Sequence, residues 1–439
     1  MQRILFFISR CDEKSGLLRQ IVNLANGLYN AGNYVEILTL SGERDDLYFP
    51  LNDGIVLTSV FGRAKNMTAD KGNSPHKEKN SAGQTLNNCK NKINCKKISP
   101  SKDVFKAVKR LVLHISFIEN RRIKKNYGSF FKATNPDIIV VWGSRRLSRA
   151  WYATRDLKCR IFDAEFNSYE KTFDLSDKHN NRLLKKIDGL IVQTNSEKEL
   201  FSSCSDRIFV INNPIIENLP MPYIGKREKR IVNFCRLSPQ KNLELLIDAF
   251  ELFHREYPDY VLQIYGDPSV DKKSDVAYQD SLLEIIKQKE LNDSVFIIPG
   301  RKDIHQEILN SAMFVSSSDY EGLSNSMLEA MAIGLPCICT DCMGGGTREV
   351  MVDYHNGIIV PMNDPKALYR AMKEYVEYPE LAEKCVKNAI KIKDRLSPDK
   401  IIMQWIEVLN KTVKNRYALM CHYYKKLREI SGKNKEEDK

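Results

Sequence analysis

Two carboxylates in the second half of the sequence lie on either side of a predicted helix start. The segment 318–332 contains Glu321 and, eight positions later, Glu329. Gly322 permits a tight turn, and Ser324 is a residue type that caps helices, here one continuing to residue 332. The backbone N–H groups and the positive end of that helix could bind a phosphate. Glu321 before the helix and Glu329 on its second turn could accept hydrogen bonds from sugar hydroxyls; alternatively, both carboxylates cap the helix or face solvent.

A second segment, 233–242, brings two cations to the end of a strand. Arg236 closes the predicted strand, Pro239 starts a helix, and Lys241 lies in the first turn of that helix. A cation at the positive end of a helix is unfavourable unless an anion is also bound. Arg236 and Lys241 therefore predict a diphosphate site, with the two side chains as its clamp. The alternative is two ordinary surface cations.

Three other patterns carry less information. The triple glycine at 344–346 opens a helix, and such turns are common. Gly16 follows the first predicted strand, but it is one glycine where the dinucleotide fingerprint has three, so an NAD site is rejected. Cys337, Cys339 and Cys342 cluster without a second CxxC or HxxxH partner, which favours buried strand residues over a zinc site.

Around these segments, short apolar runs alternate with helical periodicity almost throughout the chain, and helices such as 17–29 and 196–204 separate many of the strands. This alternation predicts parallel sheets covered by helices. The predicted strands are 4–8, 35–40, 55–60, 138–142, 161–163, 190–193, 208–211, 231–234, 261–265, 295–299, 314–316, 336–339 and 358–360.

The alternation breaks at residues 212–214 and restarts after a charged, Pro-rich stretch, 220–230. We therefore predict an α/β protein with two doubly wound, Rossmann-like domains, residues 1–220 and 221–400, that face a central cleft. Ligands of such folds bind at the carboxyl ends of the strands. Residues 401–439 are predicted to form a helical segment and a charged tail, with the helix packing back on the first domain. The stretch 64–102 is rich in Lys, Asn, Ser and Gly, which predicts a mobile basic insert.

The composition narrows the class of protein. Hydrophobic residues make up 42% and charged residues 28%, which excludes a chain disordered throughout and a multi-span membrane protein. A net charge of +12 favours an anionic partner, which could be nucleic acid, a phosphate-bearing substrate or an anionic membrane surface. Scattered cysteines, 11 in number, and the lack of an export signal favour a cytoplasmic location with reduced thiols. Residues 104–115 have the spacing of a basic amphipathic helix that could lie on anionic lipid; alternatively, their apolar stripe packs on the sheet.

Together these residues resemble a known family. The chain is similar to retaining glycosyltransferases of the GT-B fold, in the large family 4 of bacterial surface-polysaccharide enzymes. Residues 236–242, Arg-Leu-Ser-Pro-Gln-Lys-Asn, are similar to the family segment G-R-L-x-x-x-K-N, and Glu321 to Glu329 matches the motif Glu-x7-Glu. The match continues through 334–349. The resemblance is strong over about 230–360 and thinner over the first domain.

The resemblance implies a reaction. A nucleotide sugar, most simply a UDP-sugar, would be held mainly by the second domain, while the first domain would serve the acceptor. A hexosyl or N-acetylhexosaminyl group would pass with retention to a glycan or a polyprenyl-diphosphate-linked acceptor, in the synthesis of capsule, O-antigen or lipopolysaccharide. The enzyme would work in the cytoplasm, or peripherally on the cytoplasmic face of the membrane, where an anionic membrane surface would be a further partner. No cofactor and no nucleic acid are expected.

The resemblance also implies roles for particular residues. Arg236 and Lys241 would bind the donor diphosphate, Glu329 the ribose, and Glu321 the donor sugar, where it would steady positive charge at the anomeric carbon. No metal is expected, because the two cations and the helix N-terminus would neutralise the leaving diphosphate. The remaining donor-binding residues expected are Gly16, Gly322, Leu323, Ser324 and Asn325.

The departures from the family pattern concern the acceptor side. Phe166 stands where many relatives have a histidine, which leaves Glu165 and Asn167 as the polar candidates there. A degenerate relative that binds a nucleotide or an anionic polymer without turnover is therefore the alternative to an enzyme. The presence of both cations and both glutamates favours the enzyme.

Overall fold

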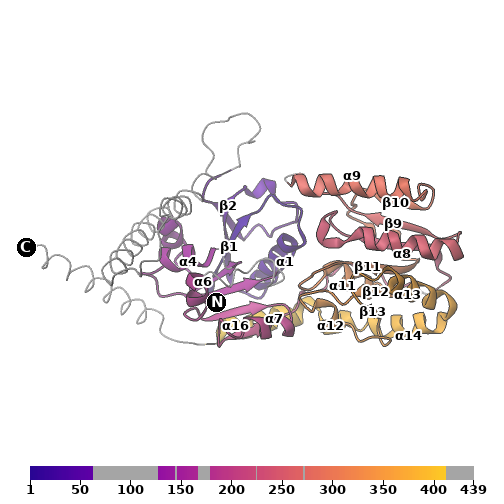
Figure 1. Cartoon of the computed structure of the whole chain (residues 1–439). Helices are drawn as coiled ribbons and strands as arrows, with labels where there is room; N and C mark the ends of the chain where they lie inside the picture. Colours follow the sequence, from indigo (N-terminus) through magenta and orange to yellow (C-terminus); the bar gives the residue numbers. More distant parts are fainter. Residues whose placement is uncertain (63–126, 144–145, 167–177, 224, 270–271, 412–439) are drawn as a thin grey trace, which may run out of the picture.

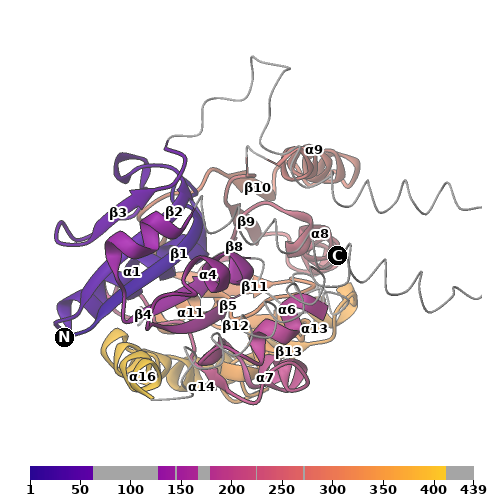
Figure 2. The same ribbon diagram turned by 90° about the vertical axis from the view of Figure 1, so that its left-hand side faces the viewer.

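The computed structural model describes residues 1–62, 127–143, 146–166, 178–223, 225–269 and 272–411. The predicted insert, the basic stretch 104–115 and the charged tail lie outside these described residues. Two parallel β-sheets, each with helices packed on it, lie side by side (Figure 1). Seen from the end of the first sheet, that sheet lies in front of the second (Figure 2). The prediction of two doubly wound α/β domains is confirmed.

The first sheet has the order β3-β2-β1-β4-β5-β6-β7, and its neighbouring strands pair in parallel. Its central strands are continuous apolar runs because helices cover both faces; β4 is buried at every position. Its strands are β1 (Arg3–Arg10), β2 (Tyr34–Ser41), β3 (Val56–Ser59), β4 (Ile138–Trp142), β5 (Arg160–Glu165), β6 (Gly189–Val192) and β7 (Ile208–Val210).

The second sheet has the order β10-β9-β8-β11-β12-β13 and is also parallel. In both sheets the strand order reverses beside the first strand of the domain, where ligands of this fold class bind. Its strands are β8 (Glu228–Phe234), β9 (Val261–Tyr265), β10 (Val295–Ile298), β11 (Ser311–Ser316), β12 (Cys337–Thr340) and β13 (Ile358–Val360).

The helices connect these strands, and long helices such as α1 (Gly16–Asn30) bury one apolar stripe. In α1, Ser15 caps the first turn by accepting from the Leu18 N–H at 3.2 Å. The other described helices are α4 (Leu147–Ala153), α6 (Lys178–Leu184), α7 (Asn195–Phe201), α8 (Leu243–Glu256), α9 (Lys273–Gln288), α10 (Ile304–Ile308), α11 (Asn325–Ala332), α12 (Gly346–Val350), α13 (Pro365–Glu377), α14 (Pro379–Ala389), α15 (Ile392–Arg395) and α16 (Pro398–Asn410), with 3₁₀ turns η1 (Arg44–Asp46) and η4 (Pro239–Lys241).

The helix α16 leaves the second domain and packs on the first. It lies below the first domain in Figure 1, apart from the other helices that follow β13. Trp405 stacks on Trp142 of β4 with ring centroids 5.9 Å apart. Ile402 fills the space above Gly27 of α1, where an added Cβ would collide with the Ile402 side chain. The chain therefore crosses between the domains twice.

The apolar core is continuous between the domains. One cluster of buried side chains lies wholly in the first domain and a second wholly in the second domain. A third joins α1, β1 and β4 to α11, β11 and α16, with Phe6, Met327 and Trp405 among its members. This shared core holds the carboxyl edges of the two sheets against each other.

Candidate functional site

The loop before α11 has the geometry expected from its sequence. Ser324 caps α11 and accepts from the Met327 N–H, so the helix starts at Asn325. Glu321 lies in the loop, where its N–H donates to the Met343 carbonyl at 3.0 Å. The loop needs a glycine at 322, because an added Cβ would collide with the side-chain oxygen of Gln193.

Lys241 and Glu321 form a close ion pair at this loop. The Lys241 ammonium contacts Glu321 Oε1, and the Ser318 hydroxyl donates to the same oxygen at 2.9 Å. The two charged side chains are only 15% and 13% exposed. Burial would lower the pKa of the Lys241 ammonium, but the Glu321 carboxylate outweighs burial and raises that pKa above its ordinary value. Lys241 is therefore held in its charged form at neutral pH.

The local structure around Lys241 differs from the prediction. As predicted, Pro239 begins a helical turn that contains Lys241, but this is a single 3₁₀ turn that ends at Lys241, and the α-helix starts only at Leu243. The reason is Asn242, which has a left-handed φ of 43° and interrupts the helix. Its side chain caps α8 by accepting from the Leu245 N–H. Lys241 is thus turned toward Glu321 and away from the axis of α8.

Arg236 lies two residues beyond the end of β8. Its Nε is 3.6 Å from Asp275 Oδ2, which itself has no hydrogen-bond partner in the described ranges. The Arg236 side chain is 41% exposed, and this long contact with Asp275 is an ion pair without a hydrogen bond. The guanidinium is therefore available to an anion that approaches Lys241.

Glu329 is buried, with 4% exposure, on the second turn of α11. Its Oε1 contacts Arg19 Nη2 of α1, and its Oε2 lies 2.8 Å from His305 Nε2 of α10. Neither partner was predicted from the sequence. A signal for Arg19 was present, because it follows Gly16 by one helical turn and so faces the same sheet edge. His305 had a weaker signal, since it lies just beyond the end of β10.

The other expected donor residues lie at the contact between the domains. Gly16 meets the N-terminus of α11, where an added Cβ would lie 2.9 Å from Asn325 Nδ2. The Asn325 side-chain oxygen accepts from Gln20 and from Asn213, each at 2.9 Å. The Leu323 N–H donates to Gln193 Oε1 at 3.1 Å. Side chains of the first domain thus hold the loop and the helix start that the phosphate would need.

The acceptor-side candidates have a different environment. Glu165 ends β5 and is buried, while Asn167 lies outside the described residues. Asp163, on the same face of β5, is fully buried, and neither of its carboxylate oxygens has a hydrogen-bond partner within the described ranges. Burial, followed by the charge of Glu165, raises the pKa of Asp163 well above its ordinary value. Burial likewise raises the pKa of Glu197 to about 8. The carboxyl edge of the first sheet is therefore rich in buried acids.

Phe166 belongs to an aromatic cluster. Its ring meets Trp142 edge-on at 4.8 Å and lies 6.3 Å from Trp405. The position at which many relatives have a histidine is here part of the packing that holds α16.

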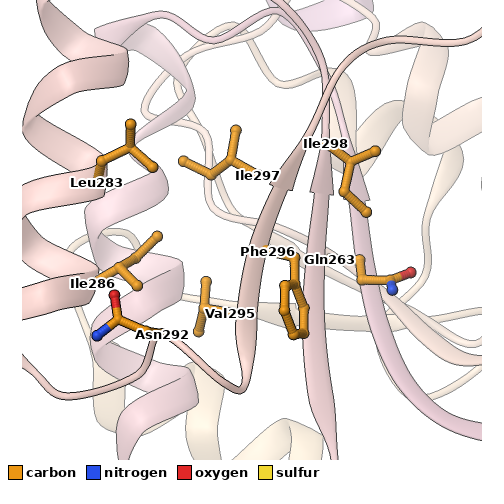
Figure 3. Close-up of a pocket in the computed structure, with 8 residues that line it drawn as sticks. All are labelled: Gln263, Leu283, Ile286, Asn292, Val295, Phe296, Ile297 and Ile298. Atoms are coloured by element: carbon orange, nitrogen blue, oxygen red, sulfur yellow. The ribbon is translucent and has the colours of Figure 1, made fainter.

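Two further features of the described residues bear on ligand binding. A hollow of about 430 Å³ lies between α9 and the edge strand β10, lined by Leu283, Ile286, Phe296 and neighbouring side chains (Figure 3). None of the expected donor residues lines this hollow. No group of three or more His, Cys, Asp or Glu residues in these ranges is arranged to hold a metal ion. Cys337 and Cys339 are buried in β12.

No helix within the ranges that the structure describes has the length and apolar character needed to cross a bilayer.

The fold and much of the sequence have counterparts among known proteins. Residues 220–392 match the family model of glycosyl transferases group 1. An uncharacterized glycosyltransferase of Haemophilus influenzae is 23% identical over 93% of this chain and its own whole length. The poly(ribitol-phosphate) alpha-N-acetylglucosaminyltransferase of Staphylococcus aureus is 28% identical over 54% of this chain, which spans 47% of that relative. A crystal structure of a mutant of S. aureus TarM, in complex with Fondaparinux, alpha-GlcNAc-glycerol and UDP, has a TM-score of 0.69 and 16% identity, covering 94% of this chain and 100% of the TarM chain.

The fold is that of the GT-B class, and the match over the second domain indicates a glycosyltransferase. Over residues 220–392, most of the second domain, the chain is similar to the family of glycosyl transferases group 1.

Proposed function

We propose that the protein transfers a sugar from a UDP-sugar, with retention of anomeric configuration, to a glycan or lipid-linked acceptor in bacterial surface-glycan synthesis. The observation that carries this proposal is the Lys241–Glu321 ion pair beside the N-terminus of α11, with the exposed Arg236 guanidinium nearby. Cations and a carboxylate are needed next to each other where a diphosphate leaves and a sugar becomes positively charged.

The charges of the site match the charges of this reaction. As the bond between the anomeric carbon and the diphosphate oxygen breaks, negative charge grows on the diphosphate. Lys241, Arg236 and the N–H groups at the start of α11 would stabilise it. Positive charge grows on the anomeric carbon, and Glu321 would stabilise that charge. The acceptor oxygen then bonds to the same carbon, and its proton leaves with the diphosphate.

The comparisons support the donor and the class of acceptor. The TarM structure contains UDP, and the S. aureus relative is named for transfer of N-acetylglucosamine to a polyol-phosphate polymer. The net charge of +12 of the present chain suits an acceptor that carries phosphate, either as a polymer or as a lipid diphosphate.

A donor panel tests the proposal directly. The purified protein is incubated with a series of UDP-sugars and GDP-sugars, and release of the nucleoside diphosphate is measured with and without candidate acceptors. We expect release from at least one UDP-sugar. Lys241→Ala should lower kcat/KM about a hundredfold, the usual effect of losing one preorganised charge stabiliser.

The matched control is Lys289→Ala. Lys289 is also ion-paired, with Asp248 at 2.9 Å and Glu251 at 2.6 Å, but none of these residues belongs to the site. The control should leave turnover unchanged. Tight UDP binding without release from any donor would favour the alternative of a binding protein. Equal turnover in Lys241→Ala and the control would refute the assignment of the diphosphate site.

A further inference from the structure

Arg19 and Glu329 form an ion pair between the two domains. Arg19 lies in the first turn of α1 of the first domain, and Glu329 in α11 of the second. The contact buries the Glu329 carboxylate almost completely, and His305 occupies its other oxygen. In this arrangement the carboxylate that the family resemblance gives to the ribose is held by a cation of the opposite domain.

The Arg19 guanidinium is poorly satisfied where it lies. Its Nε is buried and has no hydrogen-bond partner among the described residues. Its position near the N-terminus of α1, with no acidic residue in the first turn, places a cation at the positive end of the helix. An anion that reached this point would therefore bind a guanidinium with unused donors.

The N-terminus of α11 is within reach of the same side chain. Glu329 follows Asn325 by four positions, which is about 6 Å of helix axis. Gly16, one turn before Arg19, lies so close to this N-terminus that an added Cβ would be 2.9 Å from Asn325 Nδ2. A rotation of the Arg19 side chain can thus carry its guanidinium from Glu329 to a phosphate at the start of α11 without moving either helix.

The ribose and the diphosphate of a nucleotide differ in how they would affect Arg19. Ribose hydroxyls are neutral donors, and they can bind Glu329 only at an oxygen that Arg19 does not fill. A diphosphate is a strong acceptor that pairs with guanidinium in a bidentate way. A nucleoside diphosphate therefore brings both groups together: its ribose hydroxyls can bind Glu329, and its diphosphate can bind Arg19.

We propose that Arg19 is a third donor-binding cation, which neutralises Glu329 in the empty site and moves to the diphosphate when the nucleotide sugar binds. This inference rests on the proposed function and deepens it. Since α1 belongs to the first domain, the transfer makes both domains bind the donor. His305 keeps Glu329 oriented while the ribose replaces Arg19.

The test compares two ligands that differ by the diphosphate. The dissociation constants of UDP and of uridine are measured by NMR titration for the wild type, Arg19→Ala and Arg19→Gln. Arg19→Gln preserves a neutral donor for Glu329, so it provides a folded variant if removal of the whole side chain proves too disruptive. We expect UDP to bind about tenfold more weakly to both variants, the usual scale for one charge-assisted contact. Uridine should bind as well as to the wild type, or more tightly.

The matched control is Asn195→Ala, which removes another side-chain contact between the domains, the hydrogen bonds that Asn195 Nδ2 donates to the Glu349 carboxylate. It should leave the affinity for both ligands unchanged. Equal weakening of UDP and uridine in the Arg19 variants would overturn the proposal, because Arg19 would then act only by holding Glu329. Unchanged affinity for UDP would overturn it as well. Wild-type turnover of a UDP-sugar is measured in parallel, so that a failure of this inference is distinguished from a failure of the proposed function.

Discussion

The ion pair of Lys241 and Glu321 makes a prediction about stability that is independent of any substrate. Glu321→Gln keeps the size of the side chain and its hydrogen bond from Ser318 but removes the charge opposite Lys241. Breaking a fully buried ion pair costs about 3–5 kcal/mol, because the remaining charge stays buried and unpaired. The two side chains retain exposures of 15% and 13%, so we expect the low end, about 3 kcal/mol of unfolding free energy at pH 7.

The pH dependence of this loss has a definite sign. In the wild type the pKa of Lys241 is raised in the folded protein, so its stabilising contribution is complete below the ordinary value of 10.5 and is lost only as the pH rises through the folded pKa. Burial is the largest influence on the pKa of Lys241 and lowers it. In the variant the Glu321 charge that outweighs burial is missing, so the pKa of Lys241 should fall below its ordinary value. The folded variant should then hold its proton less tightly than the unfolded chain, so its stability should increase with pH up to about 10.5. The difference between wild type and variant should therefore shrink as the pH rises.

Urea unfolding at pH 7, 8, 9 and 10, followed by tryptophan fluorescence, measures this difference. The control is Glu251→Gln, which breaks the pairing of Glu251 with Arg255 and Lys289 at a more exposed place. It should cost at most about 1 kcal/mol, with no trend from pH 7 to 10. A loss in Glu321→Gln no larger than in the control, or one that stays constant with pH, would refute the reasoning.

Three further predictions concern kinetics, acid–base behaviour and packing. Glu321→Gln should lower kcat at least tenfold, about 1.4 kcal/mol, with little change in KM. Glu329→Gln should mainly raise KM, because ribose contacts change little during the reaction. The same steady-state pattern in both variants would contradict this difference in roles. Burial raises the pKa of Glu197 to about 8, so the unfolding free energy of the wild type should fall as the pH rises from 4.5 to about 8, by at most about 1.4 kcal/mol per pH unit. Glu197→Gln should remove that slope. The same pH dependence of the unfolding free energy in both proteins would contradict this prediction. Trp405→Ala should cost about 3–5 kcal/mol of unfolding free energy, because Trp405 is buried against Trp142. Met403→Ala, on the exposed side of the same helix, should be close to neutral. A small loss for Trp405→Ala would mean that α16 does not stabilise the first domain.

The fold could be predicted because its strands and helices leave patterns in short, continuous stretches of sequence. Each strand range predicted from the sequence overlaps an observed strand, since a parallel strand covered on both faces is a short apolar run such as 138–142. The cap of α11 at Ser324 was predictable for the same reason. The start of α8 was not, because the left-handed conformation of Asn242 leaves no pattern in the neighbouring residues.

For the site, the sequence predicted the local position of single residues but not the contacts between residues of different segments. Lys241 and Glu321 could each be placed at the end of a strand, but their contact depends on β8 and β11 being neighbours in the sheet. Arg19 could not be paired with Glu329, because that contact depends on how one domain faces the other. The predicted roles of the donor-binding residues and of Glu165 remain predictions, which the kinetic variants above would test.

The return of α16 to the first domain sets an order for folding during synthesis. The first domain is translated first, but Trp405 can pack on Trp142, and Ile402 on Gly27, only when α16 has been made. About 190 residues separate the last strand of the first sheet from this helix, which is roughly 10–40 s at ordinary rates of synthesis. During that interval the nascent first domain exposes an apolar surface beside the ribosome, and the second domain can complete its own sheet. The domain that is synthesised first is thus the one that finishes folding last.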